Sequence, residues 1–410
     1  MHIVFATVEF VTEGMGDGGL ANYLMKASRI FAAHGHRVTI VVSSGSNEAF
    51  EYKTNIRVVR VLREDSEIAW LLSRVKDMEL KKNLASCWHS YKVNRKIREI
   101  NSFEKIDMVQ YCHLDALGLF RMKEIPSVVR MSAFEPICRE AFKSDFILGQ
   151  QPVKIELMDK INFLALHRAD GVFAPSALTA HIIQKMINRE VKVLESPTMG
   201  VDFDSLGELP ENLSGKKYFL YFGTLNNIKG LKVLIQSIYE ILQNNPAYYF
   251  VFVGKDCGVS MQEGMRTSVV RKLKEEAKEF HDRIIYFPAM NDKGLLNAII
   301  YHAQLCILPF RFENLPNTCI EAMELGKIVI STQKSGVSQL IKDGYNGFLL
   351  EQNSPKAIVE KVQEVLALPD EKKKQITDRA VRRIQRMNPD NFYRYMMGYY
   401  QEIIQKKKRM

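Results

Sequence analysis

One lysine in the second half of the sequence stands where a phosphate would bind. Lys229 lies in the run from Gly223 to Gly230, between an apolar strand-like segment and a helix-like one. At the N-terminus of a helix, its ammonium group adds a point charge to unpaired N–H groups and to the positive end of the helix dipole, a combination that suits a phosphate. The alternative is that Lys229 extends into solvent and binds nothing.

Two carboxylates follow a later apolar segment, eight positions apart. Glu313 lies in the loop after that segment, and we expect Asn317 or Thr318 to cap a helix that ends at Gly326. Glu321 would then lie about one turn into this helix, where a carboxylate can reach the paired hydroxyls of a ribose. The alternative is that Glu321 only compensates the helix dipole.

A glycine run near the start, Gly14 to Gly19, satisfies the pattern G-x-G-x-x-G and opens a helix-like segment. A dinucleotide site would also need an acidic residue about 20 residues further on. The second strand-like segment, Arg37–Val42, instead runs into Ser43 and Ser44. We therefore interpret the run as a glycine loop whose N–H groups approach a diphosphate or a sugar, with a plain turn and a dinucleotide site as the alternatives.

The elements that must position these motifs alternate between strand-like and helix-like segments, which predicts parallel sheets with crossover helices. In the first half the strand-like segments are His2–Val8, Arg37–Val42, Ile56–Leu62, Met108–Cys112, Ser127–Met131, Gly171–Ala174 and Val191–Leu194. In the second half they are Tyr218–Phe222, Tyr248–Val253, Arg283–Phe287, Leu305–Pro309, Ile328–Ser331 and Gly347–Leu350. The Gly-, Pro- and Asp-rich stretch Ser196–Gly215 between the halves reads as a hinge. We expect an α/β protein of two Rossmann-like doubly wound domains that face each other across a cleft, with the ligand at the carboxyl ends of the strands.

The length and composition agree with this division. A chain of 410 residues with 46% hydrophobic and 25% charged residues fills two domains of about 200 residues each. We place the domains at residues 1–200 and 201–390, followed by a helix at 391–410 that packs back on the first domain. The net charge of +10 calls for an anionic partner. The absence of an apolar leader or span and six cysteines without a C-x-x-C pair predict a cytoplasmic protein.

The motifs resemble, in their order and spacing, family 4 of the retaining glycosyltransferases, whose fold is called GT-B. The resemblance starts from the paired glutamates with Glu-Ala-Met and Gly326, preceded at the right distance by the run Gly223–Gly230, and it covers nearly the whole chain. Further matching segments are Gly18-Gly19, Ala169–Ser176, Gly200–Asp202, Val251–Gly254 and Asp343–Phe348.

The resemblance implies a role for each residue of the motifs. Lys229 would bind the diphosphate of a nucleotide-sugar donor, Glu313 the transferred sugar and Glu321 the ribose; Lys229 and Glu313 would be the catalytic pair. The other implied contacts to the donor come from Gly223, Thr224, Leu315, Pro316, Asn317 and Thr318, and a donor-sugar and acceptor loop comprises Gly18, Gly19, His113 and Ser132.

The chain departs from the family pattern at two of these positions. Thr224 stands where many members have an arginine beside the lysine, so the second cation is missing or comes from elsewhere, for example from Arg311. Ser132 follows the strand that should lead into a histidine near the donor sugar, and His113 is the candidate substitute. A purely structural role for His113 is the alternative.

The implied reaction is transfer of a sugar from a UDP- or GDP-linked donor to a hydroxyl of a glycan or lipid-linked glycan, with retention and without a metal or other cofactor. The sequence has no His/Cys cluster with ligand spacing. A sugar-nucleotide epimerase of similar fold is an alternative, but it needs an acid/base pair that we do not find. A non-catalytic binder of nucleotide sugars or nucleic acid is another. We expect no nucleic acid, because the basic residues are not interleaved with aromatic ones.

One segment of the first half, Glu67–Ile100, has the composition of an interfacial amphipathic helix. Apolar side chains at Leu80, Leu84, Trp88 and Tyr91 share a helical face. The residues that we expect to meet an anionic membrane are Trp70, Trp88, Lys81, Lys82, Lys92, Arg95, Lys96 and Arg98. The alternative is that this face packs on its own domain. Since many members of the family act on lipid-linked acceptors, we expect a cytoplasmic enzyme that visits the membrane as a peripheral protein.

Overall fold

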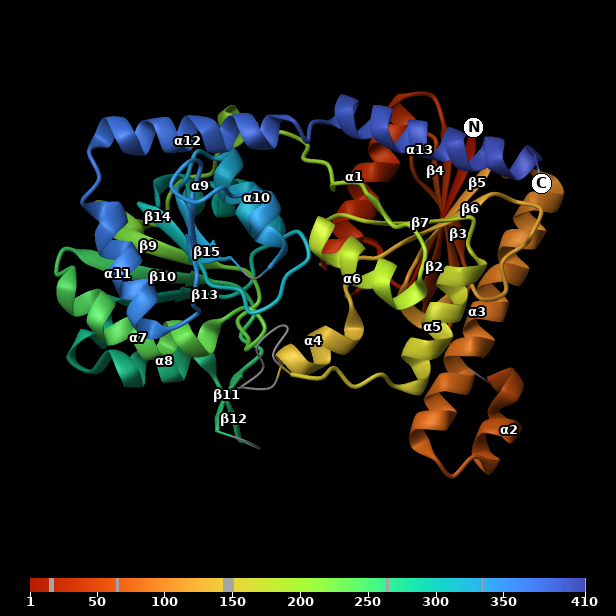
Figure 1. Ribbon diagram of the computed structural model, residues 1–410, viewed down its shortest axis with the longest axis horizontal. Helices are drawn as coiled ribbons and strands as arrows, with labels where there is room; N and C mark the ends of the chain where they lie inside the picture. Colours follow the sequence, from red (N-terminus) through yellow and green to blue (C-terminus); the bar gives the residue numbers. More distant parts are fainter. Residues whose placement is uncertain (15–17, 64–65, 143–150, 263–264, 334, 410) are drawn as a thin grey trace. The chain divides into compact units, whose positions relative to one another are not determined.

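The computed structural model describes residues 1–14, 18–63, 66–142, 151–262, 265–333 and 335–409 (Figure 1). The chain forms two compact units. Unit 1 comprises Met1–Pro136, Lys154–Met199 and Asn388–Met410, and unit 2 comprises Ile137–Val153 and Gly200–Met387. Each unit has its own sheet and its own core, and each is described separately below.

Unit 1 is built on an eight-stranded sheet with the order β3-β4-β2-β1-β5-β6-β7-β8. The strands are β1 (His2–Thr7), β2 (Arg37–Ser44), β3 (Ala49–Lys53), β4 (Ile56–Leu62), β5 (Met108–Cys112), β6 (Ser127–Arg130), β7 (Gly171–Ala174) and β8 (Lys192–Val193). All neighbours are parallel except β3, which pairs antiparallel with β4. Since the chain builds outward from β1 on one side and from β5 on the other, the switch point of this sheet lies between β1 and β5.

Helices cover the unit 1 sheet, and the last helix of the chain is one of them. They are α1 (Gly19–Ala33), α2 (Ala69–Arg74), α3 (Met78–Phe103), α4 (Glu135–Ala141), α5 (Leu157–Arg168), α6 (Ala177–Ile187) and α13 (Pro389–Arg409), of which α4 continues into unit 2. α1 packs against α13, where the Phe31 and Tyr400 rings are stacked with centroids 5.6 Å apart. The buried Tyr400 hydroxyl donates to Gln110 Oε1 in β5 at 2.7 Å, so the contact is both apolar and hydrogen-bonded.

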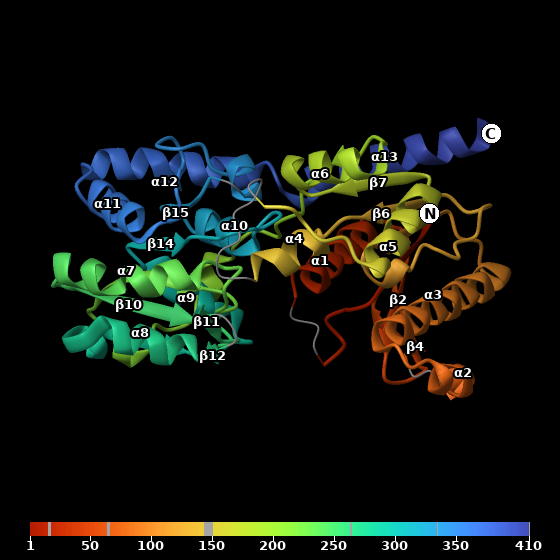
Figure 2. The ribbon, with the colours of Figure 1, turned by 60° about the horizontal axis from the view of Figure 1, so that its bottom comes forward.

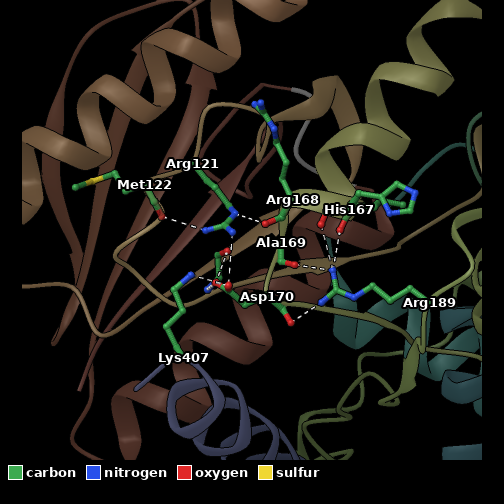
Figure 3. Close-up of polar contacts among 10 residues, drawn as sticks. Arg121, Met122, His167, Arg168, Ala169, Asp170, Arg189 and Lys407 are labelled. Atoms are coloured by element: carbon green, nitrogen blue, oxygen red, sulfur yellow. Dashed lines mark hydrogen bonds and ion pairs between the residues drawn. The ribbon is translucent and has the colours of Figure 1, made fainter. Parts of the chain in front are cut away.

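A polar cluster fastens the end of α13 to unit 1 (Figure 3). The Asp170 carboxylate accepts from Lys407 Nζ at 2.7 Å, lies 3.5 Å from the Arg121 guanidinium and accepts from the Ser127 backbone N–H at 2.9 Å. Arg189 donates to the carbonyl oxygens of Ala169 and Asp170, at 2.6 and 2.5 Å. The cluster lies at the amino ends of β6 and β7, the edge of the sheet opposite to the switch point. Its role is therefore structural.

Unit 2 is built on a six-stranded parallel sheet with the order β13-β10-β9-β14-β15-β16. The strands are β9 (Lys217–Phe222), β10 (Tyr248–Val253), β13 (Ile284–Phe287), β14 (Leu305–Leu308), β15 (Val329–Thr332) and β16 (Phe348–Leu350). Counted along the chain, this order is 3-2-1-4-5-6, the doubly wound Rossmann order with its switch point between the first and fourth strands. Those strands are β9 and β14. A separate antiparallel hairpin consists of β11 (Val259–Gln262) and β12 (Met265–Thr267).

The helices of unit 2 form two layers around the sheet, with α7, α8 and α11 on one face and α9, α10 and α12 on the other (Figures 1 and 2). They are α7 (Leu231–Asn244), α8 (Val269–Ala277), α9 (Lys293–His302), α10 (Asn317–Glu324), α11 (Pro355–Leu366) and α12 (Asp370–Gln385). These helices pack on the sheet through an apolar face. In α7 the residues of that face recur at helical spacing and are all buried: Leu231, Leu234, Ile235, Ile238 and Leu242. Complete burial of each such side chain stabilises the unit by roughly 1.5–3 kcal/mol.

The units depart from the domain boundaries placed at 1–200, 201–390 and 391–410. Residues 137–153 cluster with unit 2, although they lie within the first of those ranges. One anchor is visible in the described part of this segment, where Asn227 Nδ2 donates to the Phe142 carbonyl oxygen at 3.0 Å. The final helix begins at Pro389, two residues before the expected start.

Candidate functional site

The two motifs of the second half lie side by side at the switch point of the unit 2 sheet. The run Gly223–Gly230 follows β9, and Glu313 to Glu321 follows β14. These two strands are neighbours, with Leu305 paired to Phe219. Ligands of open α/β sheets bind in the crevice at this point, outside the carboxyl ends of the strands. Residues that are about 90 positions apart in the sequence are therefore brought to one edge of one sheet.

Glycines shape the loop that carries Lys229. Gly223 and Gly230 have φ angles of 117° and 82°, which L-residues with a side chain rarely adopt. A Cβ atom on Gly230 would also collide with the Pro309 carbonyl group at the end of β14. Gly230 is the N-cap of α7, and Lys229 directly precedes it, with its backbone N–H donating to Asn226 Oδ1 at 3.1 Å. The expected position of Lys229 at a helix N-terminus is confirmed.

The side chains of Lys229 and Glu313 contact each other directly, Nζ to Oε2. They are 27% and 19% exposed, so the pair is sheltered but reachable from solvent. Lys229 Nζ also lies 5.3 Å from the centre of the Phe310 ring, a cation–π contact that the sequence did not suggest. The structure thus brings together the two residues that the sequence assigned to a diphosphate and to a sugar.

The charges of this pair shift the pKa of two neighbouring side chains, Cys319 and Tyr221. Burial, followed by the Glu313 carboxylate, raises the pKa of the Cys319 thiol well above its usual value, with Lys229 acting in the opposite direction. Burial and Glu313 raise the pKa of the Tyr221 hydroxyl in the same way. Cys319 and Tyr221 are therefore neutral at physiological pH and support the site without adding charge.

The loop that carries Glu313 is held by a glycine that sequence reasoning missed. The Gly336 N–H donates to the Glu313 carbonyl oxygen at 2.8 Å, and a Cβ atom on Gly336 would collide with the Asn314 carbonyl group. The Asn314 backbone N–H donates to Glu313 Oε1 at 3.3 Å, so the carboxylate is bound from both sides. Nothing in the local sequence around Gly336 signals a contact made by the fold.

Helix α10 carries Glu321 as its fifth residue, one turn in, as expected. The prediction that Asn317 or Thr318 caps this helix was wrong: Pro316 is the N-cap, and no side chain makes a capping hydrogen bond there. The physical reason is that Pro316 holds the extended conformation of a cap, with φ −73° and ψ 120°, so the next two residues are already helical. Thr318 instead packs against Gly223, because a Cβ on this glycine would lie 3.3 Å from Thr318 Cγ2.

The remaining donor residues lie around the same edge. Leu315, which precedes α10 in the sequence, is buried. Thr224 is exposed, and its carbonyl oxygen accepts a hydrogen bond from Tyr221 Oη at 2.9 Å. The Arg311 N–H donates to the Ile228 carbonyl oxygen at 2.9 Å, which places Arg311 beside the residue that precedes Lys229. Arg311 is thus within the site that lacks an arginine at position 224.

The residues expected in the donor-sugar and acceptor loop all lie at the carboxyl edge of the unit 1 sheet. Gly18 and Gly19 follow β1, His113 follows β5 and Ser132 follows β6, and the Ser132 N–H donates to His113 Nδ1 at 3.3 Å. Residues 15–17 of the glycine run lie outside the described residues. These four residues belong to unit 1 and the Lys229–Glu313 pair to unit 2, so the two groups lie in different units.

Sequence reasoning missed the group that lies at the N-terminus of α1. Glu9 Oε1 accepts from the Ala21 N–H at 3.1 Å, and a Cβ atom on Gly18 would lie 2.8 Å from the same oxygen. Glu9 therefore supplies a negative charge where the glycine loop was expected to meet a diphosphate. Gly18 leaves room for this carboxylate beside the start of α1.

The proposed membrane segment folds as α2 and α3, with α2 at the rim of unit 1 (Figures 1 and 2). Trp70 is 62% exposed, and Leu80, Leu84 and Trp88 are exposed or half-buried rather than packed in the core. α3 turns a different face inward, whose buried residues are Asn83, His89, Ser90, Lys92, Val93, Asn94 and Ile97.

The basic residues of this segment divide into engaged and available ones. Lys92 is buried and donates to the Leu62 carbonyl oxygen at 2.8 Å, so its inclusion among the membrane-facing residues was wrong. Lys96 pairs with Glu99 at 2.6 Å, and Arg95 lies 3.8 Å from Glu67. In the described part of the chain, Lys81, Lys82 and Arg98 form no ion pair.

The described residues contain neither a helix that could span a membrane nor a cluster of metal-ligating side chains. None of the helices there is both long and apolar enough to cross a membrane. No group of three or more His, Cys, Asp or Glu side chains is arranged there to hold a metal ion.

The chain is similar to one protein family and to several curated proteins. Residues 209–383 match the model of the family "Glycosyl transferases group 1". This range contains both motifs of the switch point and the six strands of the unit 2 sheet. Over 164 residues the chain is 28% identical to lipopolysaccharide 1,2-N-acetylglucosaminetransferase of Salmonella typhimurium, covering 39% of this chain and 42% of that protein. The aligned parts span 42 to 50% of the length of such curated relatives.

Solved structures match the whole chain. Sucrose-phosphate synthase from Thermosynechococcus elongatus superposes with a TM-score of 0.72 at 15% identity, over 99% of this chain and 100% of that one. HepE from Anabaena, in complex with UDP, superposes with a TM-score of 0.68 at 15% identity, over 98% and 100%. The fold is α/β of the GT-B type, which confirms the fold class predicted from the sequence.

Proposed function

We propose that the chain is a retaining glycosyltransferase, of the kind found in family 4, that moves a sugar from a nucleoside-diphosphate sugar to a hydroxyl of a glycan. One observation carries the proposal: Lys229 and Glu313 meet at the switch point of a domain that matches group 1 glycosyl transferases. A cation beside a helix N-terminus suits the diphosphate, and a carboxylate next to it suits the hydroxyls of the sugar.

Lys229 is assigned to the leaving group. As the bond from the anomeric carbon to the phosphate oxygen breaks, negative charge develops on the departing diphosphate and the sugar becomes oxocarbenium-like. A preorganised cation at that charge is worth about 10²–10³ in rate. The acceptor oxygen then bonds to the anomeric carbon on the same face, and its proton passes to the departing phosphate. No step is assigned to a metal ion, since Lys229 supplies the positive charge.

Glu313 and Glu321 are assigned to the hydroxyl groups of the donor. Glu313 would bind the transferred sugar, and Glu321, one turn into α10, the two hydroxyls of the ribose. The backbone N–H groups of Leu315, just before α10, and of Asn317 and Thr318, at its start, would complete the phosphate contacts, since no side chain makes a capping hydrogen bond there. The UDP bound to HepE favours a uridine donor, with GDP as the other base to test.

The acceptor is proposed to be lipid-linked and reached at the anionic cytoplasmic face of a membrane. The support is the rim of unit 1, where Trp70 and Met78 are more than half exposed and Lys82 and Arg98 lie on the same pair of helices. Each basic side chain near an anionic surface contributes about 1 kcal/mol, so a few suffice for reversible binding. Attachment would then be peripheral, by surface side chains alone.

The test is a screen of donors by product release. The purified chain is incubated with UDP- and GDP-linked hexoses and N-acetylhexosamines, and free nucleoside diphosphate is measured with and without lipid-linked acceptors. We expect one donor to release its nucleotide slowly alone and faster with an acceptor. Release of no nucleotide from any donor, or conversion of the donor into an epimer that keeps its nucleotide, would contradict the proposal.

A further inference from the structure

A buried arginine in unit 1 has no anionic partner among the residues that the structure describes. Arg130 ends β6, at the carboxyl edge of the sheet, and is 4% exposed. Its guanidinium group lies over the Tyr23 ring, 3.8 Å from the ring centre, and its two Nη groups donate to the hydroxyls of Ser132 and, at 2.9 Å, of Ser196. Nε makes no hydrogen bond with any part of the chain that the structure describes.

The charge of Arg130 is surrounded by groups that are neutral at pH 7. Burial lowers the pKa of the guanidinium, and the acidic groups that oppose this effect are Tyr23 and Cys112. Burial raises the pKa of the Tyr23 hydroxyl and brings that of the Cys112 thiol to about 12, so neither carries a negative charge. A buried cation without a counter-ion is costly, and replacing it by an apolar residue would remove that cost. No carboxylate of the described residues acts on Arg130, so an anion brought by a ligand would offset its buried charge.

A second unpartnered donor belongs to the same cluster. His113 Nδ1 accepts from the Ser132 N–H, so the neutral ring carries its proton on Nε2. That Nε2 is buried and makes no hydrogen bond with the described residues, since Glu135 Oε1, at 3.7 Å, is too far for one. Ser132 thus links two side chains, Arg130 and His113, that each hold a buried N–H without an acceptor.

We propose that Arg130 anchors an anion-binding site at the carboxyl edge of the unit 1 sheet, which takes a phosphate or carboxylate group of a sugar ligand. In the structure the hydroxyls of Ser132 and Ser196 occupy the positions that two oxygens of that group would take, because a guanidinium fork binds two oxygens side by side. The His113 Nε2–H supplies a third donor. The identification of the ligand as the acceptor or the donor sugar rests on the proposed function. The anion site itself does not depend on that function.

The test is a binding measurement without any nucleotide sugar, so it succeeds or fails independently of transferase activity. Every protein carries Lys229→Ala, because inorganic phosphate also suits that lysine. Calorimetry measures the affinities of inorganic phosphate, glucose 6-phosphate, glucuronate and neutral glucose for this parent and for Arg130→Met. The matched control is Arg121→Met, which removes a largely buried arginine at the opposite edge that already has Asp170 as its partner (Figure 3).

We expect the parent to bind a phosphate or a carboxylate, and Arg130→Met to bind it about 10- to 100-fold more weakly, as for the loss of a charge-assisted hydrogen bond. Arg121→Met should bind as the parent does, and neutral glucose should respond little to either change. Preference for glucose 6-phosphate or for glucuronate identifies the source of the anion.

Three results would overturn the proposal. The first is equal anion affinity in Arg130→Met and the parent, and the second is no preference of the parent for anions over glucose. The third is unchanged anion affinity in Arg130→Lys. This variant keeps the positive charge and serves as the test if Arg130→Met does not fold. This variant lacks the planar fork and should bind the anion several-fold more weakly than the parent. Unchanged affinity in Arg130→Lys would refute the two-oxygen geometry.

Discussion

Replacing Glu313 by glutamine should strengthen the binding of a nucleoside diphosphate and at the same time slow the transfer of the sugar. The Glu313 carboxylate forms an ion pair with the Lys229 ammonium. An arriving diphosphate must compete for that ammonium and is also repelled by the carboxylate. Glutamine has the same shape without the charge, so both penalties on diphosphate binding disappear.

The magnitude follows from the exposure of the pair. Two unit charges about 4 Å apart attract by roughly 4 kcal/mol at an effective dielectric constant of about 20. The side chains are 27% and 19% exposed, so solvent screening and side-chain entropy reduce the net coupling. We take about 1–2 kcal/mol, which corresponds to a nucleoside diphosphate Kd about 5- to 30-fold lower in Glu313→Gln. Turnover should fall about 10- to 100-fold, because a charge-assisted hydrogen bond to the sugar is lost.

The assay is calorimetric titration with UDP and GDP at two salt concentrations, followed by measurement of turnover with the active donor. Glu360→Gln is the matched control, because Glu360 forms an ion pair with Lys356, 3.7 Å away in α11 and outside the switch point. The control should change neither quantity. An unchanged or weaker nucleotide affinity in Glu313→Gln would refute the idea that Glu313 and the diphosphate compete for Lys229.

Three further predictions concern stability and the membrane. Asp170→Asn should lower the free energy of unfolding by about 2–3 kcal/mol, since Lys407 and Arg121 lose their shared carboxylate, and an unaltered urea midpoint would show that this cluster does not fasten α13. Burial lowers the pKa of His89 to about 4, so the folded protein resists a proton that the unfolded chain takes up below about 6.5. Stability is therefore lost as the pH falls from 6.5 towards 4, and His89→Phe should remove roughly 2–3 kcal/mol of the difference between pH 7 and pH 4 in urea titrations; an equally steep pH dependence in the variant would contradict this. Trp70→Ser should weaken co-sedimentation with anionic vesicles at low salt about tenfold, because the side chain is 62% exposed and ready to enter an interface, whereas equal binding would place the contact elsewhere.

The sheets and the main motif were predictable from the sequence because their signals are local. A buried parallel strand such as β14 (Leu305–Leu308) is a continuous apolar run, and the glycine at position 230 marks the start of α7. The contact between Lys229 and Glu313 was predictable from these strands together with the topology. Once both loops follow strands of one doubly wound sheet, the topology brings them to the switch point.

Edges and helix faces were harder to predict. β3 (Ala49–Lys53) escaped notice because an edge strand with alternating exposed residues has no apolar run. The inward face of α3 is mostly polar: Asn94 Nδ2 donates to the Leu117 carbonyl oxygen at 2.7 Å, and Ser90 Oγ to that of Ala116 at 2.9 Å. Hydrophobic periodicity therefore gives no signal for this inward face.

Contacts between distant side chains could not be predicted at all. Glu9 lies against Gly18, and Arg130 donates to Ser196, 66 residues further along the chain. A single sequence carries no signal for such pairs, because each depends on how strands and loops are arranged in space. The segment 137–153 is a similar case, since only the fold shows that Asn227 holds Phe142 within unit 2.

The most direct test of the central claim is the rate of nucleoside diphosphate release by Lys229→Ala with the donor that the parent uses. Lys356→Ala is the control. Lys356 lies in the first turn of α11 and, like Lys229, forms an ion pair with a glutamate, Glu360. We predict that Lys229→Ala lowers turnover by about 10²–10³ with nearly unchanged thermal stability, and that Lys356→Ala retains full activity. Equal turnover in Lys229→Ala and the parent would contradict the assignment of Lys229 to the diphosphate.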